Sequence, residues 1–336
     1  MDHQQHALRI GAAAILCALL LRLSSPGILE NVAGFLSKPS ISSFLIYLET
    51  GRIVRFSPSL DDREVFSMES PPPDFAKTDN SLTPLPIFSA ADGAAVTVKS
   101  NTTRDADMEE LITRPLNWDL TGPEPTVLIL HTHATESYEK GPGERYQESS
   151  AYRTLDEDYN MISIGDELAR LLEAGGVKAV HDRTLHDHPS YSGSYNHARK
   201  SIGQYLEEYP SIRLVLDLHR DASDNYNNQM RTQAWVDSKS SAQIMLVVGT
   251  DGSGLKHPNW EENLALALKL HTQCERVAPG IMRYVNLRAQ RFNQDMSTGA
   301  LIVEIGAAGN THAEALTATE VLAKAILSLS KGTGIS

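Results

Sequence analysis

From Val127 to its end, the chain alternates short apolar runs with longer segments whose apolar residues recur at helical spacing. The run VLILHTH, from Val127 to His133, has the length and near-continuous apolarity of a buried strand. The segment from Asn160 to Gly176 has a helical repeat and closes on Gly-Gly, a common helix stop. Alternation of this kind predicts an α/β fold with a mainly parallel central sheet flanked by helices.

The same alternation continues through the rest of the chain. Strands are predicted at 177–180, 212–219, 232–238, 242–250 and 300–306, and helices at 195–210, 259–279 and 312–331. In sheets of this class, ligands bind beyond the carboxyl ends of the strands. The residues that close each predicted strand are therefore the candidates for chemistry.

Composition narrows the kinds of site that this chain can build. Its 336 residues have a formal net charge of -12 and no basic patch, which argues against a nucleic-acid partner. The two cysteines, Cys17 and Cys274, are too few for a thiolate zinc cluster, and Cys17 lies in an apolar N-terminal run that makes a disulfide framework implausible. Any metal site must therefore use histidine and carboxylate side chains.

The run from Ala7 to Leu23 is mostly apolar, with Arg9 and Arg22 on either side of a short core. Such a core is shorter than the roughly 20 residues of a membrane span and has the length of a signal-peptide core. Flanking arginines can snorkel to the interface, however, and no clean A-x-A cleavage site follows. We therefore favour a retained anchor in the cell membrane at residues 1–24 over a cleaved signal, with the rest of the chain extracytoplasmic.

Residues 25–121 are predicted to form a linker or stalk. The stretch from Ser57 to Thr121 is rich in proline, serine and aspartate, includes three consecutive prolines at 71–73, and has few long apolar runs. The compact catalytic domain is expected at residues 122–336.

Charged or imidazole residues close three of the predicted strands. His133 and Glu136 follow the first strand in H-x-x-E spacing, which places an imidazole and a carboxylate about one turn apart. His219 closes the strand at 212–219, and Glu304 lies in the apolar run LIVEIG, where a carboxylate is costly to bury unless it is paired or near a metal. We expect a Zn2+ site with His133, Glu136 and His219 as ligands, one open position for water, and Glu304 as the general base.

Other histidines compete for these roles. Strand alternation places His131 on the same face as His133, so His131 is either a ligand or a residue that orients one. His181, His186 and His188 form a second cluster. Because isolated H-x-x-E pairs are frequent by chance, spacing leaves the choice among these histidines open.

Three long motifs resemble those of the stage II sporulation protein P family of endospore-forming bacteria. They are HTHATESY, DLHRDA and FNQDMSTGALIVEIGAAGNT, and the resemblance covers residues 126–311 together with the N-terminal anchor. Matched motif by motif, the histidine of HTHATE is His131 or His133, that of DLHRDA is His219, and the glutamate of LIVEIG is Glu304.

The resemblance implies a zinc N-acetylmuramoyl-L-alanine amidase, which cleaves the amide between N-acetylmuramic acid and L-alanine in peptidoglycan and extends to peptide cross-links. It implies a fold similar to that of zinc amidases. It implies two partners, the lytic transglycosylase stage II sporulation protein D and the membrane protein stage II sporulation protein M, and a role in septal wall remodelling and forespore engulfment. In the wider amidase group the carboxylate ligand often lies well after the first histidine, which would select Asp156, Glu157 or Asp158 instead of Glu136.

Polar residues beside the motifs have expected supporting roles. Arg220 can stabilise the oxyanion of amide hydrolysis, or form a plain salt bridge to Asp217 or Asp221. Asn293 and Gln294 can hold the peptide stem of the substrate, or be ordinary loop residues. For both sets the two interpretations stay open on the sequence.

Two other functions fit parts of the pattern. A zinc carboxypeptidase-like peptidase also has H-x-x-E followed by a distant histidine, but it needs an arginine to bind the substrate carboxylate. A non-catalytic wall-binding scaffold is the second alternative. The intact set of His133, His219 and Glu304 argues against a scaffold, because a degenerate enzyme need not retain it.

Overall fold

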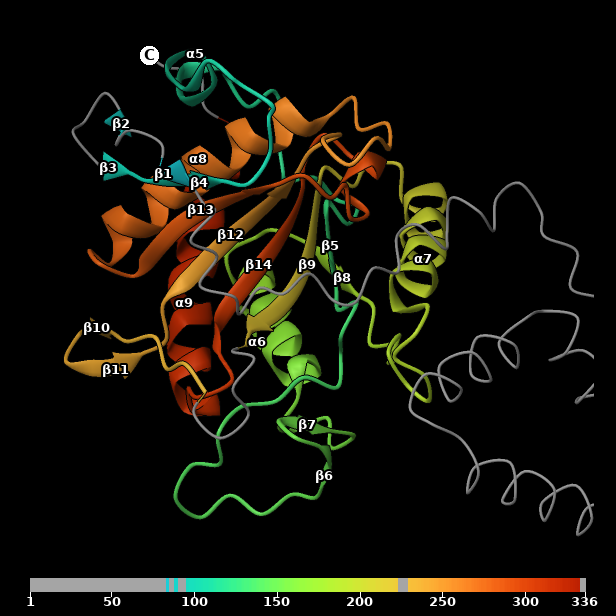
Figure 1. The fold of residues 1–336 in the computed structure, drawn as a ribbon, viewed down its shortest axis with the longest axis vertical. Helices are drawn as coiled ribbons and strands as arrows, with labels where there is room; N and C mark the ends of the chain where they lie inside the picture. The colour runs from blue at the N-terminus through green and yellow to red at the C-terminus, as the bar shows by residue number, and fades with distance from the viewer. Residues whose placement is uncertain (1–82, 85–87, 90–94, 223–228, 333–336) are drawn as a thin grey trace, which may run out of the picture. The chain divides into compact units, whose positions relative to one another are not determined.

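The computed structural model describes residues 83–84, 88–89, 95–222 and 229–332. At its centre is an eight-stranded sheet in the order β1-β4-β13-β12-β14-β9-β5-β8 (Figure 1). Its strands are β1 (Thr83–Pro84), β4 (Val98–Ser100), β5 (Val127–Leu130), β8 (Ala179–His181), β9 (Leu214–Asp221), β12 (Ile244–Gly249), β13 (Met282–Arg288) and β14 (Ala300–Ala307). The predicted α/β class, with a mainly parallel central sheet flanked by helices, is confirmed.

Strand direction divides the sheet into two halves. β4, β13 and β12 run parallel to one another, and so do β14, β9, β5 and β8. Because β12 and β14 are antiparallel, the carboxyl ends of the two halves lie at opposite edges of the sheet. The three strands that precede or carry the sequence motifs, β5, β9 and β14, therefore end at one common edge.

Helices cover both faces of the sheet. They are α5 (Met108–Thr113), α6 (Met161–Ala174), α7 (Ser194–Glu208), α8 (Trp260–Val277) and α9 (His312–Ser328). The main core joins α5, α6, α8 and α9 to one face, on which Ile129 lies, whereas α7 packs on the other face against Leu128 (Figure 1). Successive strand residues point to opposite faces, so β5 contributes to both cores.

Local sequence signals account for the helix starts. The Asn160 side chain accepts a hydrogen bond from the backbone N–H of Ile162 (2.9 Å) and caps α6. Thr311 and Glu314 form a reciprocal capping box at the start of α9. These caps satisfy backbone donors that a helix cannot bond internally, and they hold both helices on the main core face.

The folded domain begins before Gly122, so the expected boundary at 121/122 is wrong. β4 pairs with β13, and Val98, Leu111 and Leu120 are buried in the main core. Residues 95–121 therefore belong to the domain rather than to a linker. Scattered apolar residues that pack on an existing core produce no long apolar run, which is why the composition of this stretch is misleading.

The expected anchor at residues 1–24 and most of the expected linker lie outside the described residues. Within the described ranges, no helix combines the length and apolarity needed to cross a bilayer. The remaining short elements are β2 (Phe88–Ser89), β3 (Ala95–Val96), β6 (Glu148–Ser150), β7 (Arg153–Thr154), β10 (Ala234–Val236), β11 (Lys239–Ser241) and the 3-10 turn η1 (Gln294–Met296).

Candidate active site

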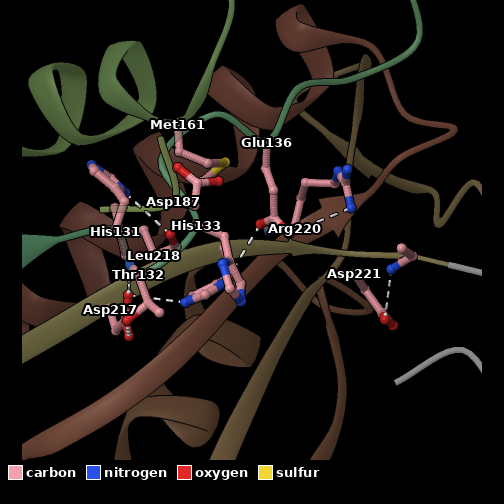
Figure 2. Close-up of polar contacts among 12 residues, drawn as sticks. His131, Thr132, His133, Glu136, Met161, Asp187, Asp217, Leu218, Arg220 and Asp221 are labelled. Atoms are coloured by element: carbon pink, nitrogen blue, oxygen red, sulfur yellow. Dashed lines mark hydrogen bonds and ion pairs between the residues drawn. The ribbon is translucent and has the colours of Figure 1, made fainter. Parts of the chain in front are cut away.

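The motif residues meet at the common carboxyl edge of β5, β9 and β14. β5 ends at Leu130, so the residues that follow it form a turn rather than the strand end predicted through His133. β9 lies between β5 and β14, and Glu304 of β14 is the register partner of His219 on β9. Figure 2 shows the turn after β5 and the end of β9 contributing side chains to one polar group.

His133, Glu136 and His219 are all buried at this edge. The Nδ1 atom of His219 lies 3.5 Å from Oε2 of Glu136. The rings of His133 and His219 pack edge to face, with centroids 5.2 Å apart. Nδ1 of His133 is buried without a hydrogen-bond partner in the structure. The edge thus holds an imidazole nitrogen with unused bonding capacity next to a histidine–carboxylate pair.

This donor set suits a zinc ion. Two imidazoles and one carboxylate are the ligands of many hydrolytic zinc sites, and they leave a fourth position open. In the described part of the chain, no three His, Cys, Asp or Glu side chains are already arranged around a metal position. The unbonded Nδ1 of His133 nevertheless gives this group a free ligand atom. The residues present fit zinc, and His133, Glu136 and His219 would hold it.

Glu304 is a buried carboxylate beside this group. Its Oε2 atom has no hydrogen-bond partner. Burial raises the pKa of Glu304 to about 8, helped by the charges of Asp221 and Glu136 and opposed by that of His219. A carboxyl group with this proton affinity can both accept and release a proton near neutral pH.

Residues 68–327 match the sequence profile of stage II sporulation protein P. The chain belongs to the stage II sporulation protein P family. It is 29% identical over 202 residues to stage II sporulation protein P of Bacillus subtilis (strain 168), a match that covers 56% of this chain and 47% of that protein. The match thus spans about half the length of that relative.

Solved structures with a similar arrangement include two amidases. The N-acetylmuramoyl-L-alanine amidase AmiC2 of Nostoc punctiforme has a TM-score of 0.37 and 16% identity, covering 62% of this chain and 97% of that one. The N-acetylmuramoyl-L-alanine amidase of Clostridium difficile 630 has a TM-score of 0.37 and 15% identity, with the same two coverages.

In this family member, two residues that the motifs did not single out hold the histidines in place. Asp217 Oδ1 lies 2.9 Å from Nε2 of His219, and the same carboxylate accepts hydrogen bonds from the backbone N–H (2.7 Å) and hydroxyl (2.6 Å) of Thr132 (Figure 2). The hydroxyl of Tyr191 lies 3.0 Å from Nε2 of His133. Both contacts use Nε2, so neither Asp217 nor Tyr191 occupies the Nδ1 atom of His219 or His133. The D-x-H spacing within β9, which places both side chains on one face, is a signal that could have identified Asp217.

The charges of this group support one another. Burial opposes an imidazolium, but Asp217 and Glu136 together raise the pKa of His219 well above its usual range. Burial also opposes ionisation of Glu136, yet the charges of Arg220, His219 and Arg153 lower its pKa overall. Burial lowers the pKa of His133 to about 3, so this ring is neutral at physiological pH and free to act as a ligand.

The contacts of Arg220 differ from those expected for an oxyanion donor and from those expected for a salt bridge to Asp217 or Asp221. Its Nε and Nη2 atoms donate to the backbone oxygens of Ser137 and Tyr152, at 2.9 Å each, and Nη1 lies 3.7 Å from Oε1 of Glu136. Its ion-pair partner is therefore Glu136 rather than Asp217 or Asp221. Because Nε and Nη2 bond backbone oxygens on either side of the site and Nη1 pairs with Glu136, the contacts of Arg220 favour a role in positioning Glu136. Asp221 instead pairs with Arg283 of β13 (2.6 Å).

His131 points away from His133, so the expectation of a shared face is wrong. Its Nε2 lies 2.8 Å from Nε2 of His181, and its Nδ1 bonds the backbone oxygen of Leu218 (3.1 Å). A Cβ atom on Gly165 would lie 2.6 Å from Nε2 of His131, so only glycine leaves room for this pair. Strand alternation fails here because β5 has already ended. Through Leu218, His131 supports the backbone next to His219.

The second histidine cluster does not form. His181 bonds His131 and Asp166, His186 bonds Asp182 through Nε2 (3.0 Å), and His188 is exposed. These histidines therefore do not share a ligand position.

The alternative carboxylates are also placed elsewhere. Glu157 and Asp158 are exposed, and Glu157 pairs with Arg183. Asp156 accepts a hydrogen bond from the backbone N–H of Asp158 (3.2 Å). Glu136, by contrast, contacts His219 directly, so the geometry favours Glu136 over the three later acids.

Asn293 and Gln294 are buried, and their side-chain amides bond the protein backbone. They are not exposed to hold a peptide stem. The Gln294 side chain bonds the backbone of β12 twice: Oε1 accepts from the N–H of Gly249 (2.7 Å), and Nε2 donates to the oxygen of Val247 (2.8 Å). The Nδ2 atom of Asn293 donates to the backbone oxygen of Tyr195 (2.8 Å). These two residues join the 3-10 turn to the sheet and to α7.

Proposed function

We propose that this chain is a zinc-dependent peptidoglycan hydrolase that cleaves the amide bond between N-acetylmuramic acid and L-alanine. The observation that carries the proposal is the meeting of His133, Glu136 and His219 with the buried Glu304 at one sheet edge. Membership of the stage II sporulation protein P family supports peptidoglycan in sporulating cells as the substrate. Cleavage of peptide cross-links is a further activity that the resemblance suggests.

The chain's own residues account for the proton movements of the reaction. A bound zinc ion would supply Lewis-acid polarisation and a low-energy position for water. Glu304 takes a proton from the attacking water as the oxygen forms a bond to the amide carbonyl carbon. The carbon–nitrogen bond then breaks, and Glu304 returns the proton to the leaving nitrogen. The products are a lactyl carboxylate on the sugar and a free amino terminus on L-alanine.

The arrangement of Arg220 does not favour the carboxypeptidase alternative. Such a peptidase needs an arginine that is free to bind the carboxylate of the substrate. Arg220 is instead bonded to Ser137, Tyr152 and Glu136. An internal amide, which presents no terminal carboxylate, suits this site better.

The test is mass spectrometry of products from purified sacculi digested by the full chain, with zinc and with a chelator. The full chain is used because residues 95–121 belong to the folded domain. New lactyl ends that appear only without chelator are expected. Released carboxy-terminal amino acids would indicate a carboxypeptidase, and digestion that is unchanged by chelator would refute zinc dependence.

We further propose that the chain is held on the cell membrane by residues 1–24, with the catalytic domain outside. There it would act in forespore engulfment with stage II sporulation proteins D and M, as the family resemblance suggests. Protease added to spheroplasts should digest the domain. A domain that is protected until the membrane is permeabilised would overturn the extracytoplasmic location.

A further inference from the structure

Tyr195, in the first turn of α7, has a buried hydroxyl without a hydrogen-bond partner. Buried polar groups in folded proteins almost always have a partner, because an unbonded one costs stability. An exception therefore calls for a reason, such as a catalytic role or a bound water. The surroundings of this hydroxyl decide which reason applies.

The tyrosine ring is held firmly at the site. It packs edge-on against His133, with ring centroids 5.6 Å apart and an interplanar angle of 88°, and its centroid lies 5.9 Å from that of the Phe292 ring. Its backbone oxygen accepts the hydrogen bond from Asn293 described above. The hydroxyl also lies within the electrostatic range of Asp217, Glu304 and Glu136. Tyr195 is thus a rigid donor beside His133, the proposed zinc ligand, and within electrostatic range of Glu304, the proposed general base.

Other donors around the site are already in use. Arg220 donates from Nε and Nη2 to backbone oxygens and pairs with Glu136 through Nη1, and the Tyr191 hydroxyl is bonded to His133. The hydroxyls of Thr132 and Thr135 donate to Asp217 and Asp187. The Ser137 hydroxyl lies beside the hydroxyl of Tyr146 rather than at the histidines.

We propose that the Tyr195 hydroxyl donates a hydrogen bond to the carbonyl oxygen of the scissile amide as that oxygen gains negative charge. The proton stays on the tyrosine throughout, so the covalent steps are those of the proposed function, on which this inference rests. A donor that is fixed in place and unbonded before the substrate arrives stabilises the transition state without first breaking another hydrogen bond. This assigns to Tyr195 the role that the sequence suggested for Arg220.

The test is Tyr195→Phe in the full chain, assayed with zinc on a soluble N-acetylmuramoyl-peptide. We expect kcat to fall about 10²–10³-fold, the loss typical of one oxyanion donor, with little change in KM. Zinc content should be unchanged. The melting temperature should be equal or higher, because the variant removes an unbonded buried group. Tyr205→Phe, the same change further along α7, is the matched control and should keep the wild-type kcat.

Three results would overturn the inference. A Tyr195→Phe protein with wild-type kcat would show that the hydroxyl is idle or only binds a resident water. A lower melting temperature or lower zinc content in that variant would show a structural role instead. An inactive wild-type protein would remove the proposed function and this inference together, whereas an active wild type with an active variant removes only the inference.

Discussion

His131 and His133 are two residues apart in one turn, yet their surroundings are opposite. His131 uses both ring nitrogens, one on His181 and one on Leu218, and His181 in turn bonds Asp166. His133 uses Nε2 on Tyr191 and leaves Nδ1 unbonded and buried. We call these the support group (His131, His181 and Asp166) and the ligand group (His133, Glu136 and His219).

The two groups differ in whether all of their ring nitrogens have hydrogen-bond partners. In the support group, each histidine nitrogen has a partner, so the group can stabilise the turn but has no atom left for a ligand. In the ligand group, an unbonded nitrogen costs stability unless something binds to it. Bonding capacity that the fold leaves unused, rather than the presence of histidine, therefore marks the side of the turn where we propose the zinc site.

The largest effect is expected for His219→Ala. This variant removes one imidazole ligand and leaves Asp217 and Glu136 without their shared partner. Zinc should be lost and turnover on peptidoglycan should fall below detection. Metal analysis of the purified protein is the measurement, and full zinc occupancy would contradict the ligand assignment.

Glu304→Gln is expected to separate metal binding from catalysis. Glutamine preserves the shape of the side chain but cannot accept the proton from water. Turnover should fall about 10²–10⁴-fold, the usual cost of losing a general base, while zinc content and melting temperature are kept. A folded variant that holds zinc and still works at more than about a tenth of the normal rate would rule out this role. Loss of zinc would make Glu304 a ligand and weaken the claim of Glu136.

Asp217→Asn is expected to weaken the ligand group without abolishing it. The Asp217 carboxylate orients His219 through Nε2, and loss of such a partner typically lowers metal affinity about 10–100-fold. Competition with a chelating dye measures that affinity. Asp182→Asn is the matched control, since Asp182 bonds Nε2 of His186 in a similar way outside the ligand group. Equal affinities in the two variants would contradict the positioning role of Asp217.

His181→Ala should affect stability rather than zinc binding. The substitution leaves Nε2 of His131 buried and unbonded, which costs about 1–3 kcal/mol. Thermal unfolding should show a lower melting temperature, with zinc content and turnover retained. Zinc loss in a variant that stays folded would break the distinction between the support group and the ligand group.

The last prediction concerns pH and the metal-free protein. The pKa of Glu304 is raised from its ordinary value of 4.5 to about 8 on folding. Such a carboxyl contributes stability at pH below its unfolded-state pKa, and the contribution is lost as pH rises through the folded-state pKa. The melting temperature of wild-type protein should therefore fall relative to Glu304→Gln between about pH 4.5 and pH 8, by about 2–4 °C per kcal/mol. If the melting temperatures of wild-type protein and Glu304→Gln changed with pH in the same way across that range, the raised pKa of Glu304 would be contradicted.

Much of the fold could be predicted from periodicity. The segment from Asn160 to Gly176 became α6 at Met161–Ala174, and the run at 300–306 became β14 at Ala300–Ala307. β13 was not predicted, because Arg283 and Arg288 interrupt its apolar pattern. Arg283 is accommodated within the sheet by its ion pair with Asp221, a residue far away in the chain.

For the site, the sequence by itself determined which strand ends carry the candidate residues: His133, Glu136, His219 and Glu304 could all be named from local motifs. Tertiary structure decided the roles of their neighbours. It turned His131 toward His181, committed Arg220 to the turn after β5, and left the Tyr195 hydroxyl unbonded. The physical reason is that strand and helix patterns depend on residues close in sequence, whereas the bonding of a buried polar atom depends on partners brought near by the fold.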